Sequence, residues 1–236
     1  MIDVKILTGY PEMFPGVLAH SLIGKALKKN IFTIKTINLH DFGFDSRKSI
    51  DDEPFGGGPG MILRPEVVEK ALLSFSDNKN LNSTKIYLTP SGSLLNQEKL
   101  EIFAKLEEII ILCGRFEGVD QRAIEVLGFE EISIGDYILA GGEIAAQVLL
   151  EGCIRLIPGV LGHPKSLLEE SFSNNLLEYP HYTRPKVWED SLGNKHDVPE
   201  VLTTGHHDNI KKWRQNKSIE KTKKIRPDLY IKKDKK

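Results

Sequence analysis

Cysteine is scarce in this chain, and the usual signals for export or membrane insertion are missing. The 236 residues include two cysteines, Cys113 and Cys153, which sit in apolar surroundings and form no Cys-x-x-Cys motif. This usage argues against a disulfide framework or a zinc site and is typical of a reduced intracellular protein. The amino terminus lacks the basic-then-apolar order of a signal peptide, and Glu143 interrupts the best candidate for a membrane span. We therefore expect a soluble, cytoplasmic protein with no membrane partner.

Familiar nucleotide-binding and catalytic motifs are also absent. Gly24 and Lys25 lack the upstream glycine of a P-loop, and no Gly-x-Gly-x-x-Gly follows a predicted strand, which argues against a Rossmann dinucleotide site. No Gly-x-Ser-x-Gly elbow or Cys/His pair suggests an acyl-transfer nucleophile. The adjacent His206 and His207 lack the spacing of a metal pair on one helix face. The sequence therefore predicts no protein metal site.

The net charge is only −1, but the charge is unevenly spread. From Leu177 to Lys236 there are 15 Lys and Arg against 9 Asp and Glu, a net of +6, which leaves the first 176 residues at −7. An acidic body with a basic tail suggests a polyanionic partner that is met mainly through the C-terminal part. A solvated, solubilising lysine tail has the same composition, so charge alone leaves both interpretations open.

Aliphatic and β-branched runs alternate with helix-like stretches in the first 157 residues. This alternation predicts an α/β fold with a mostly parallel sheet covered on both faces. The predicted strands are Val4–Leu7, Ile31–Leu39, Ile86–Thr89, Ile109–Cys113 and Glu131–Ile134. The predicted helices are Phe14–Lys29, Pro65–Phe75, Gln97–Leu106, Val119–Leu127 and Glu143–Leu150. Helix breakers after Ile157 mark a boundary, and short helical patterns beyond about residue 175 predict a small second domain of helices.

Three predicted strands end in loops that suit ligand binding, at residues 87–92, 113–118 and 133–143. Ligands of parallel sheets bind at the carboxyl ends of the strands, so we expect these loops to share one rim. The loop Ser133–Glu143 combines Gly135, Gly141 and Gly142 with one carboxylate and one aromatic ring, which a purine-bearing cofactor requires. For that stretch alone, an ordinary strand-to-helix turn is an equal alternative.

Two further features concern a substrate. The segment Asp51–Met61 contains four glycines, which leave backbone accessible to a substrate; the alternative is a flexible tight turn. Arg155 interrupts an apolar run, so it is either paired structurally or aimed at a ligand. On composition alone, Glu169 and Glu170 could belong to an ordinary helix start.

Taken together, these segments resemble the bacterial tRNA (guanine-37-N1)-methyltransferase family (TrmD), which belongs to the knotted SPOUT class. Each matching stretch is modestly specific, and their order and spacing along nearly the whole chain carry the resemblance. The stretches are Pro11–Phe14, Asp51–Asp52 with Gly56–Met61, Cys113–Gly118, Ser133–Glu143, Ile157–Gly162 and Pro180–Pro185.

The resemblance implies S-adenosylmethionine bound in a deep C-terminal trefoil knot made by the three rim loops. It implies a knotted catalytic domain over residues 1–158, a mobile linker or lid over 159–175, and a helical tRNA-binding domain over 176–236. It also implies a homodimer whose active sites are shared between subunits. The family match assigns the cofactor to Tyr87, Leu88, Thr89, Pro90, Gly114, Phe116, Glu117, Ser133, Ile134, Gly135, Asp136, Tyr137, Ile138, Leu139, Gly141 and Gly142.

The implied reaction moves a methyl group to N1 of the guanosine just 3′ of the anticodon. Guanine N1 holds a proton at neutral pH, so a base must remove it while a cation stabilises the charge that develops near O6. The match implies that Arg155 is the cation that stabilises the charge near O6. It places Glu170 at the position of the family's aspartate base, with Glu169 as the alternative base. Phe116 also departs from the pattern, since many relatives have tyrosine there.

The match also places the substrate guanosine near Gly58, Pro59 and Gly60. Candidates for contacts with tRNA phosphates are Lys211, Lys212, Arg214 and Lys217, with Trp213 in the core of that domain. Family behaviour also suggests assistance from Mg²⁺, although no metal cage is evident in the sequence. The rival interpretations are a knotted methyltransferase acting on ribosomal RNA and an RNA-binding protein that holds the cofactor without turnover.

Overall fold

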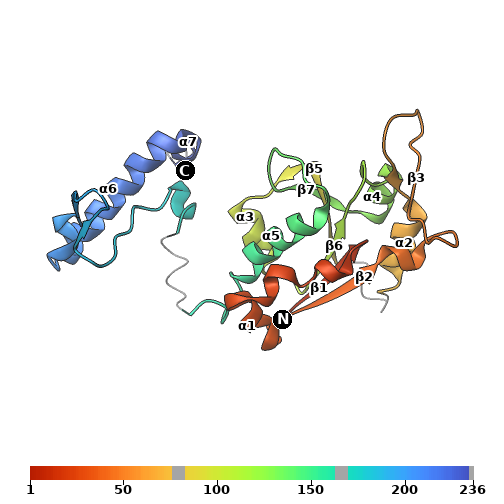
Figure 1. The fold of residues 1–236 in the computed structure, drawn as a ribbon, viewed down its shortest axis with the longest axis horizontal. Coiled ribbons are helices and arrows are strands. Elements are labelled where there is room, and N and C mark those ends of the chain that lie inside the picture. The colour runs from red at the N-terminus through yellow and green to blue at the C-terminus, as the bar shows by residue number, and fades with distance from the viewer. Residues whose placement is uncertain (76–82, 163–169, 234–236) are drawn as a thin grey trace. The chain divides into compact units, whose positions relative to one another are not determined.

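The computed structural model describes residues 1–75, 83–162 and 170–233 (Figure 1). The chain divides into two compact units, Met1–Gly162 and His163–Lys236. The division falls four residues beyond residue 158, where the predicted catalytic domain ends. Among the described residues, no helix is both long enough and apolar enough to cross a membrane.

The first unit is built on a five-stranded sheet in which every neighbouring pair is parallel, with the strand order β2-β1-β6-β5-β7. Residues Ile109–Cys113 of β6 are all buried, as expected for a strand covered on both faces. This confirms the predicted α/β fold with a mostly parallel sheet. The strands are β1 (Ile2–Thr8), β2 (Phe32–Asn38), β5 (Thr84–Leu94), β6 (Glu108–Cys113) and β7 (Glu130–Ser133).

Helices cover both faces of this sheet because alternate strand residues point to opposite sides. On one face, α1 (Ser21–Lys28), α3 (Gln97–Phe103) and α5 (Gly142–Ile154) pack with Ile109 and Ile111 in one apolar cluster. On the other, α2 (Pro65–Leu73) and α4 (Gln121–Leu127) pack with Ile110 and Leu112 in a second cluster (Figure 1).

The predicted helix over Phe14–Lys29 is wrong in its extent. A 3-10 turn, η2 (Gly16–Ala19), is separated by His20 from α1, which begins at Ser21. Ser21 has a φ of 54°, in the left-handed region that no continuous α-helix contains. Two further 3-10 turns, η1 (Pro11–Met13) and η3 (Leu39–Phe42), follow the ends of β1 and β2.

The end of β7 pairs with two separate lengths of β5. Ile132 is the partner of both Leu88 and Ser93, so the residues between them bulge out of the ladder. Leu95 N then donates to Ser133 O at 2.8 Å. Gly92 lies against the backbone of β7, where an added Cβ would be 2.4 Å from Ile132 N. β7 is therefore held closely along its whole length.

Over its described residues, 170–233, the second unit contains the helices α6 (His207–Ile225) and α7 (Pro227–Lys233) and the 3-10 turns η6 (Ser173–Asn175) and η7 (Glu200–Thr203). It also contains an antiparallel hairpin of β8 (Val187–Glu189) and β9 (Lys195–Asp197), which the sequence did not predict. The carboxylate of Asp190 fixes the turn by accepting hydrogen bonds from the ring of His196 and from Leu192 N and Asn194 N. These contacts, His196 first, lower the pKa of Asp190 to about 2.

The close packing of Gly92 against the backbone of β7 gives a prediction about stability. We expect Gly92→Ala to lower the free energy of unfolding by about 2 kcal/mol, because the new methyl group meets strand backbone that has no room to move. Urea denaturation measures the change. Gly162→Ala is the matched control, since nothing lies within 4 Å of its added Cβ. Equal stability of the two variants would contradict the close packing described for β7.

Candidate functional site

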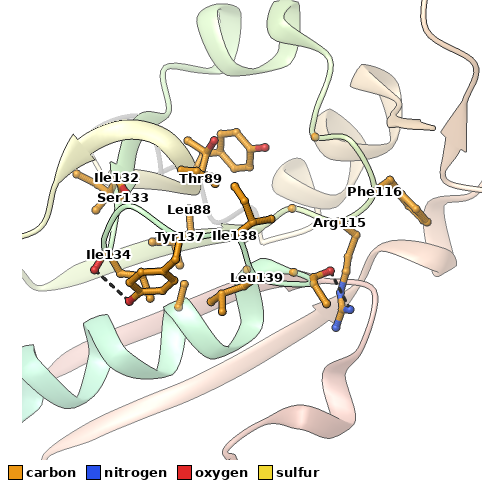
Figure 2. Close-up of a pocket in the computed structure, with 18 of the residues that line it drawn as sticks. Leu88, Thr89, Arg115, Phe116, Ile132, Ser133, Ile134, Tyr137, Ile138 and Leu139 are labelled. Carbon is orange, nitrogen blue, oxygen red and sulfur yellow. Dashed lines mark hydrogen bonds between the residues drawn. The ribbon is translucent and has the colours of Figure 1, made fainter. Parts of the chain in front are cut away.

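The carboxyl ends of β5, β6 and β7 open into one pocket with a volume of about 240 Å³ (Figure 2). This is the rim where parallel sheets bind ligands. The lining comes from three loops far apart in the sequence: Tyr87, Leu88, Thr89, Pro90, Gly114, Arg115, Phe116, Glu117, Gly118, Ile132, Ser133, Ile134, Gly135, Tyr137, Ile138, Leu139, Ala140, Gly141, Gly142 and Ala145.

The structure brings together 15 of the 16 residues that the sequence assigned to the cofactor; Asp136 is not in the lining. It adds Arg115, Gly118, Ile132, Ala140 and Ala145. Arg115, Gly118 and Ala140 lie inside loops that the sequence had already marked, so they could have been included. Ile132 and Ala145 belong to a strand and a helix, and only the packing of these elements brings them to the pocket.

The pocket walls are mostly apolar side chains and exposed backbone. Gly114 lies against the ring of Tyr87, where an added Cβ would be 2.7 Å from a ring carbon. Burial raises the pKa of Tyr87, so its hydroxyl remains a protonated donor. Gly135 has a φ of 151°, which few other residues adopt, and its N–H donates to the hydroxyl of Ser133. Figure 2 shows the bond from the Tyr137 hydroxyl to Ile134 O, which folds this loop back on itself.

A buried carboxylate fixes the side of the pocket where α5 begins. Glu143 is 1 % exposed, and its Oε2 lies 3.0 Å from Nε of Arg115. The hydroxyl of Thr8, at the end of β1, donates to Glu143 Oε1 at 2.8 Å. Arg115 also donates to Ala140 O and lies 4.2 Å from the ring centroid of Tyr10. One ion pair thus joins the ends of β1 and β6 to the loop that enters α5.

Cys113 ends β6 beside this pocket but has no nucleophilic character. Burial, and then the negative charge of Glu143, raise the pKa of its thiol well above the ordinary range. Burial also raises the pKa of Cys153, on α5, to about 12. Because the thiolate is the reactive form, both cysteines are packing residues.

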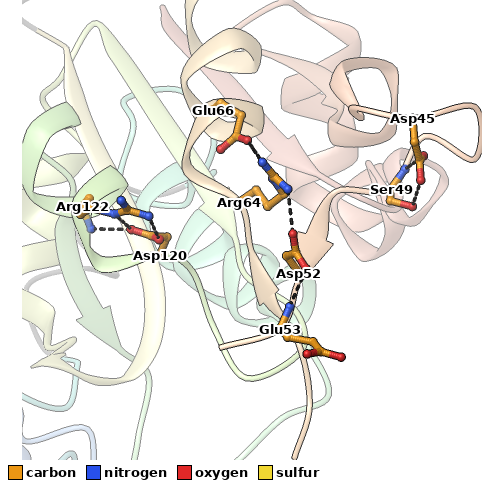
Figure 3. Close-up of polar contacts among 8 residues, drawn as sticks. All are labelled: Asp45, Ser49, Asp52, Glu53, Arg64, Glu66, Asp120 and Arg122. Carbon is orange, nitrogen blue, oxygen red and sulfur yellow. Dashed lines mark hydrogen bonds and ion pairs between the residues drawn. The ribbon is translucent and has the colours of Figure 1, made fainter. Parts of the chain in front are cut away.

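The glycine-rich segment forms a small hairpin beside the pocket, between β3 (Asp51–Asp52) and β4 (Ile62–Leu63). Arg64 holds its base: the guanidinium donates to Asp52 at 2.7 Å and pairs with Glu66 in the first turn of α2 (Figure 3). The same guanidinium lies 4.1 Å from the ring centroid of Phe44. Arg64 therefore joins the base of the hairpin to the first turn of α2.

Backbone hydrogen bonds connect β4 to the pocket loop that follows β6. Glu117 N donates to Met61 O, and Leu63 N donates to Gly118 O, at 2.9 and 3.0 Å. An added Cβ on Gly60 would lie 2.3 Å from the side chain of Glu117. Gly60, predicted to contact the substrate, is thus adjacent to the pocket, whereas Gly56, Gly57 and Gly58 have open space around them.

Arg155, one of the two predicted catalytic residues, is not in the lining of this pocket. Arg155 follows the last residue of α5, whereas the pocket lies at the first. The pocket lining extends to Ala145, so at 1.5 Å per residue the remaining ten residues separate it from Arg155 by about 15 Å. Glu170 belongs to the second unit, and Glu169 lies outside the described residues.

The predicted phosphate contacts all lie on α6, with Lys211 and Lys212 exposed and Trp213 half-buried. Lys217 pairs with Glu220 at 2.7 Å. In residues 1–75, 83–162 and 170–233, no group of three or more His, Cys, Asp or Glu side chains could hold a metal ion.

A doubly covered parallel sheet with a glycine-lined pocket at its carboxyl edge defines an α/β protein with a small-molecule site at that edge. Residues 2–232 match the family described as tRNA (Guanine-1)-methyltransferase TrmD. The chain belongs to this family.

Close relatives carry one name, tRNA (guanine-N(1)-)-methyltransferase. The protein from Rhodospirillum rubrum is 48% identical over 95% of this chain and 91% of its own length. The protein from Ehrlichia canis is 47% identical over 97% of this chain and 95% of its own length. The protein from Bartonella henselae is 48% identical over 97% of this chain and 94% of its own length.

The buried ion pair gives a prediction for the pocket. We expect Glu143→Gln to lower the free energy of unfolding by about 2 kcal/mol, because the amide keeps the bond from Thr8 but leaves Arg115 without its counter-charge. Urea denaturation measures the loss. Glu151→Gln, an exposed glutamate on the same helix, is the control and should change stability by less than about 0.5 kcal/mol. A similar effect of both substitutions would argue against the network.

The raised thiol pKa values predict inert cysteines. At pH 8.5 the native protein should not react with iodoacetamide at Cys113 or Cys153, because both thiols stay protonated and buried. After unfolding in urea, both should be alkylated within minutes. Mass spectrometry of the native and unfolded samples counts the labels, and rapid labelling of the native protein at Cys113 would contradict the burial described.

Proposed function

We propose that the protein transfers the methyl group of S-adenosylmethionine to N1 of the guanosine at position 37 of tRNA, next to the anticodon. The observation that carries the proposal is the family match over residues 2–232, together with the convergence of the matched loops on one pocket. The names of the relatives supply the reaction and the substrate class.

We also propose that the chain forms a deep trefoil knot at this pocket. Two observations support the knot. The end of β7 pairs with two lengths of β5. The chain then returns across the end of β5, so that Gly142 N donates to Gly114 O beside β6.

The pocket residues fit S-adenosylmethionine. Leu88, Ile134 and Leu139 offer apolar walls for adenine, and the glycines leave backbone groups accessible for hydrogen bonds to the base edge. When bound, S-adenosylmethionine supplies an electrophilic methyl group on a positively charged sulfur. The protein's task is to bend the methionine part so that this methyl group faces the substrate and to exclude water from the reaction.

The acid–base part of the reaction is assigned to two side chains. Glu170 takes the proton from guanine N1, and Arg155 donates hydrogen bonds to O6, where negative charge develops. The freed electron pair on N1 forms the bond to the methyl carbon, and the electrons of the broken sulfur–carbon bond stay on sulfur. Glutamate is one methylene longer than the family's aspartate, so its placement depends on the segment that carries it.

The distance along α5 supports a homodimer with shared sites. Arg155 is ten residues beyond Ala145 of the pocket lining, about 15 Å along the helix, which favours a role for Arg155 at the pocket of a second copy. α5 also exposes apolar side chains that a partner would cover, since Ile144 and Val148 are each 49 % exposed. Ile138, in the neighbouring pocket loop, is 80 % exposed.

We propose that residues 176–236 bind the anticodon stem and that a lid over residues 159–175 closes on the target base; residues 163–169 of this lid lie outside the described part of the chain. The net charge of +6 from Leu177 onward and the exposed lysines of α6 support phosphate contacts. The target base must leave its stack to reach the pocket, as for other enzymes that act on bases. For Mg²⁺, the described residues offer no clustered donor set, and the proposed steps do not use it.

An assay with two tRNA transcripts tests the reaction. The protein should transfer labelled methyl groups from S-adenosylmethionine to a transcript with G at position 37 and not to one with A there. Transfer to both or to neither would overturn the proposal. An enzyme for ribosomal RNA would instead methylate a ribosomal transcript, and a binding-only protein would bind the cofactor without turnover.

Substitution of the linker carboxylates tests the base. We expect Glu170→Gln to lower the single-turnover rate by about 100-fold or more, because the amide cannot accept the N1 proton. Glu169→Gln and the exposed Glu189→Gln should retain most of the rate. Full activity of the Glu170→Gln variant would mean that another group removes the N1 proton.

Mixed dimers test the shared site. Gly114→Val blocks the pocket beside Tyr87, and Arg155→Ala removes the cation, so each homodimer should be inactive. In a mixed dimer, one site combines an intact pocket with the intact Arg155 of the other subunit, so refolding the two variants together should restore activity. A mixture that stays inactive, although mixed dimers are present, would mean that each pocket uses its own Arg155.

A further inference from the structure

The residues that follow Glu170 form a compact turn held by its own hydrogen bonds. Phe172 N donates to Leu176 O at 2.7 Å, and Asn175 N donates to Phe172 O at 3.2 Å. The hydroxyl of Ser171 accepts from Glu178 N at 3.1 Å. Phe172, Asn174 and Asn175 all have φ values between 54° and 77°, so this turn has one specific, costly backbone shape.

The residue that follows this turn, Leu177, is hydrogen-bonded to a buried hydroxyl on α6. Thr222 is 0 % exposed, and its Oγ1 accepts from Leu177 N at 2.8 Å. The same hydroxyl donates to Ser218 O, one helical turn earlier, at 2.6 Å. A threonine inside a helix usually bonds only to the helix backbone; here it also accepts from a part-buried N–H of another segment.

Neighbouring contacts extend the attachment. Lys221 Nζ donates to Glu178 O at 3.0 Å, and the guanidinium of Arg214 lies 4.8 Å from the ring centroid of Tyr179. The 3-10 turn η6 itself contacts α7. The segment after Glu170 is therefore hydrogen-bonded to α6 and packed against α7. α6 is also the helix that carries the proposed phosphate contacts.

We propose that Thr222 is a positioning residue for Glu170, and that α6 thereby delivers the base together with the tRNA. This inference rests on the proposed role of Glu170. Binding of the anticodon stem to α6 sets the location of the helix, and the Thr222–Leu177 bond transmits that location to the turn that begins after Glu170. The carboxylate then reaches guanine N1 only when the correct nucleic acid occupies the second unit, and small errors in its placement slow proton transfer.

Thr222→Val removes the hydroxyl and keeps the shape of the side chain. We expect the single-turnover rate of methyl transfer to fall ten- to a hundredfold, while the Kd values for tRNA and S-adenosylmethionine change less than twofold. Thr222→Ser, which keeps the hydroxyl, should retain a rate within about threefold of the unchanged protein. Thr203→Val is the matched control, because this exposed hydroxyl donates to Glu200 O within its own 3-10 turn.

Hydrogen exchange provides a readout that does not depend on activity. The amide of Leu177 should exchange at least tenfold faster in Thr222→Val than in the unchanged protein or in Thr222→Ser, because its acceptor is lost. If Thr222→Val weakens tRNA binding as much as it slows transfer, the residue is merely structural and the inference is wrong. Ser171→Ala, which removes the acceptor of Glu178 N inside the turn, should reproduce the slow transfer.

The outcomes separate this inference from the assignment of the base. Activity of Glu170→Gln equal to that of the unchanged protein would overturn the base assignment, whatever Thr222→Val does. A slow Glu170→Gln with an unaffected Thr222→Val would overturn only the positioning role. If both substitutions act on the same step, the double variant Glu170→Gln, Thr222→Val should be no slower than Glu170→Gln alone.

Discussion

The ion pair between Arg115 and Glu143 is the contact on which the pocket depends. Its carboxylate is almost completely buried at the start of α5, where it also receives the hydroxyl of Thr8. A buried carboxylate is tolerated only with such partners, so the pair fixes three segments that are far apart in the sequence. The glycines around it allow the close approach, since an added Cβ on Gly141 would lie 2.4 Å from Arg115 Nε. The pocket is thus shaped before any ligand arrives.

The two units contribute different parts of the proposed chemistry. The first unit provides a rigid pocket at the edge of its sheet, and the glycine-rich hairpin is bonded to that pocket through β4. The second unit carries Glu170 and the basic helix α6. If the base travels with the tRNA-binding unit, then a tRNA that does not engage α6 leaves the proton of guanine N1 in place. Selectivity then comes from the placement of one carboxylate as well as from affinity.

Much of the first unit could be predicted from sequence, because β-branched runs and strand-end glycines reflect local physics. The five strands and the pocket loops follow from such patterns. The division of the helix at Ser21 could not be predicted, since its apolar spacing continues through the break. Arg115 lies in a marked loop, but its ion pair with Glu143 could not be predicted, because the partner is 28 residues away and only folding brings the two together. The hairpin of β8 and β9 has three-residue strands with every side chain exposed, so it leaves no hydrophobic pattern.

The length of α5 has a consequence for how the enzyme behaves on dilution. A helix of 13 residues keeps its two ends apart for as long as it remains helical. If the pocket at one end and Arg155 at the other must work together, turnover per protein molecule depends on protein concentration. It falls once the concentration drops below the dissociation constant of the dimer, even though every subunit remains folded.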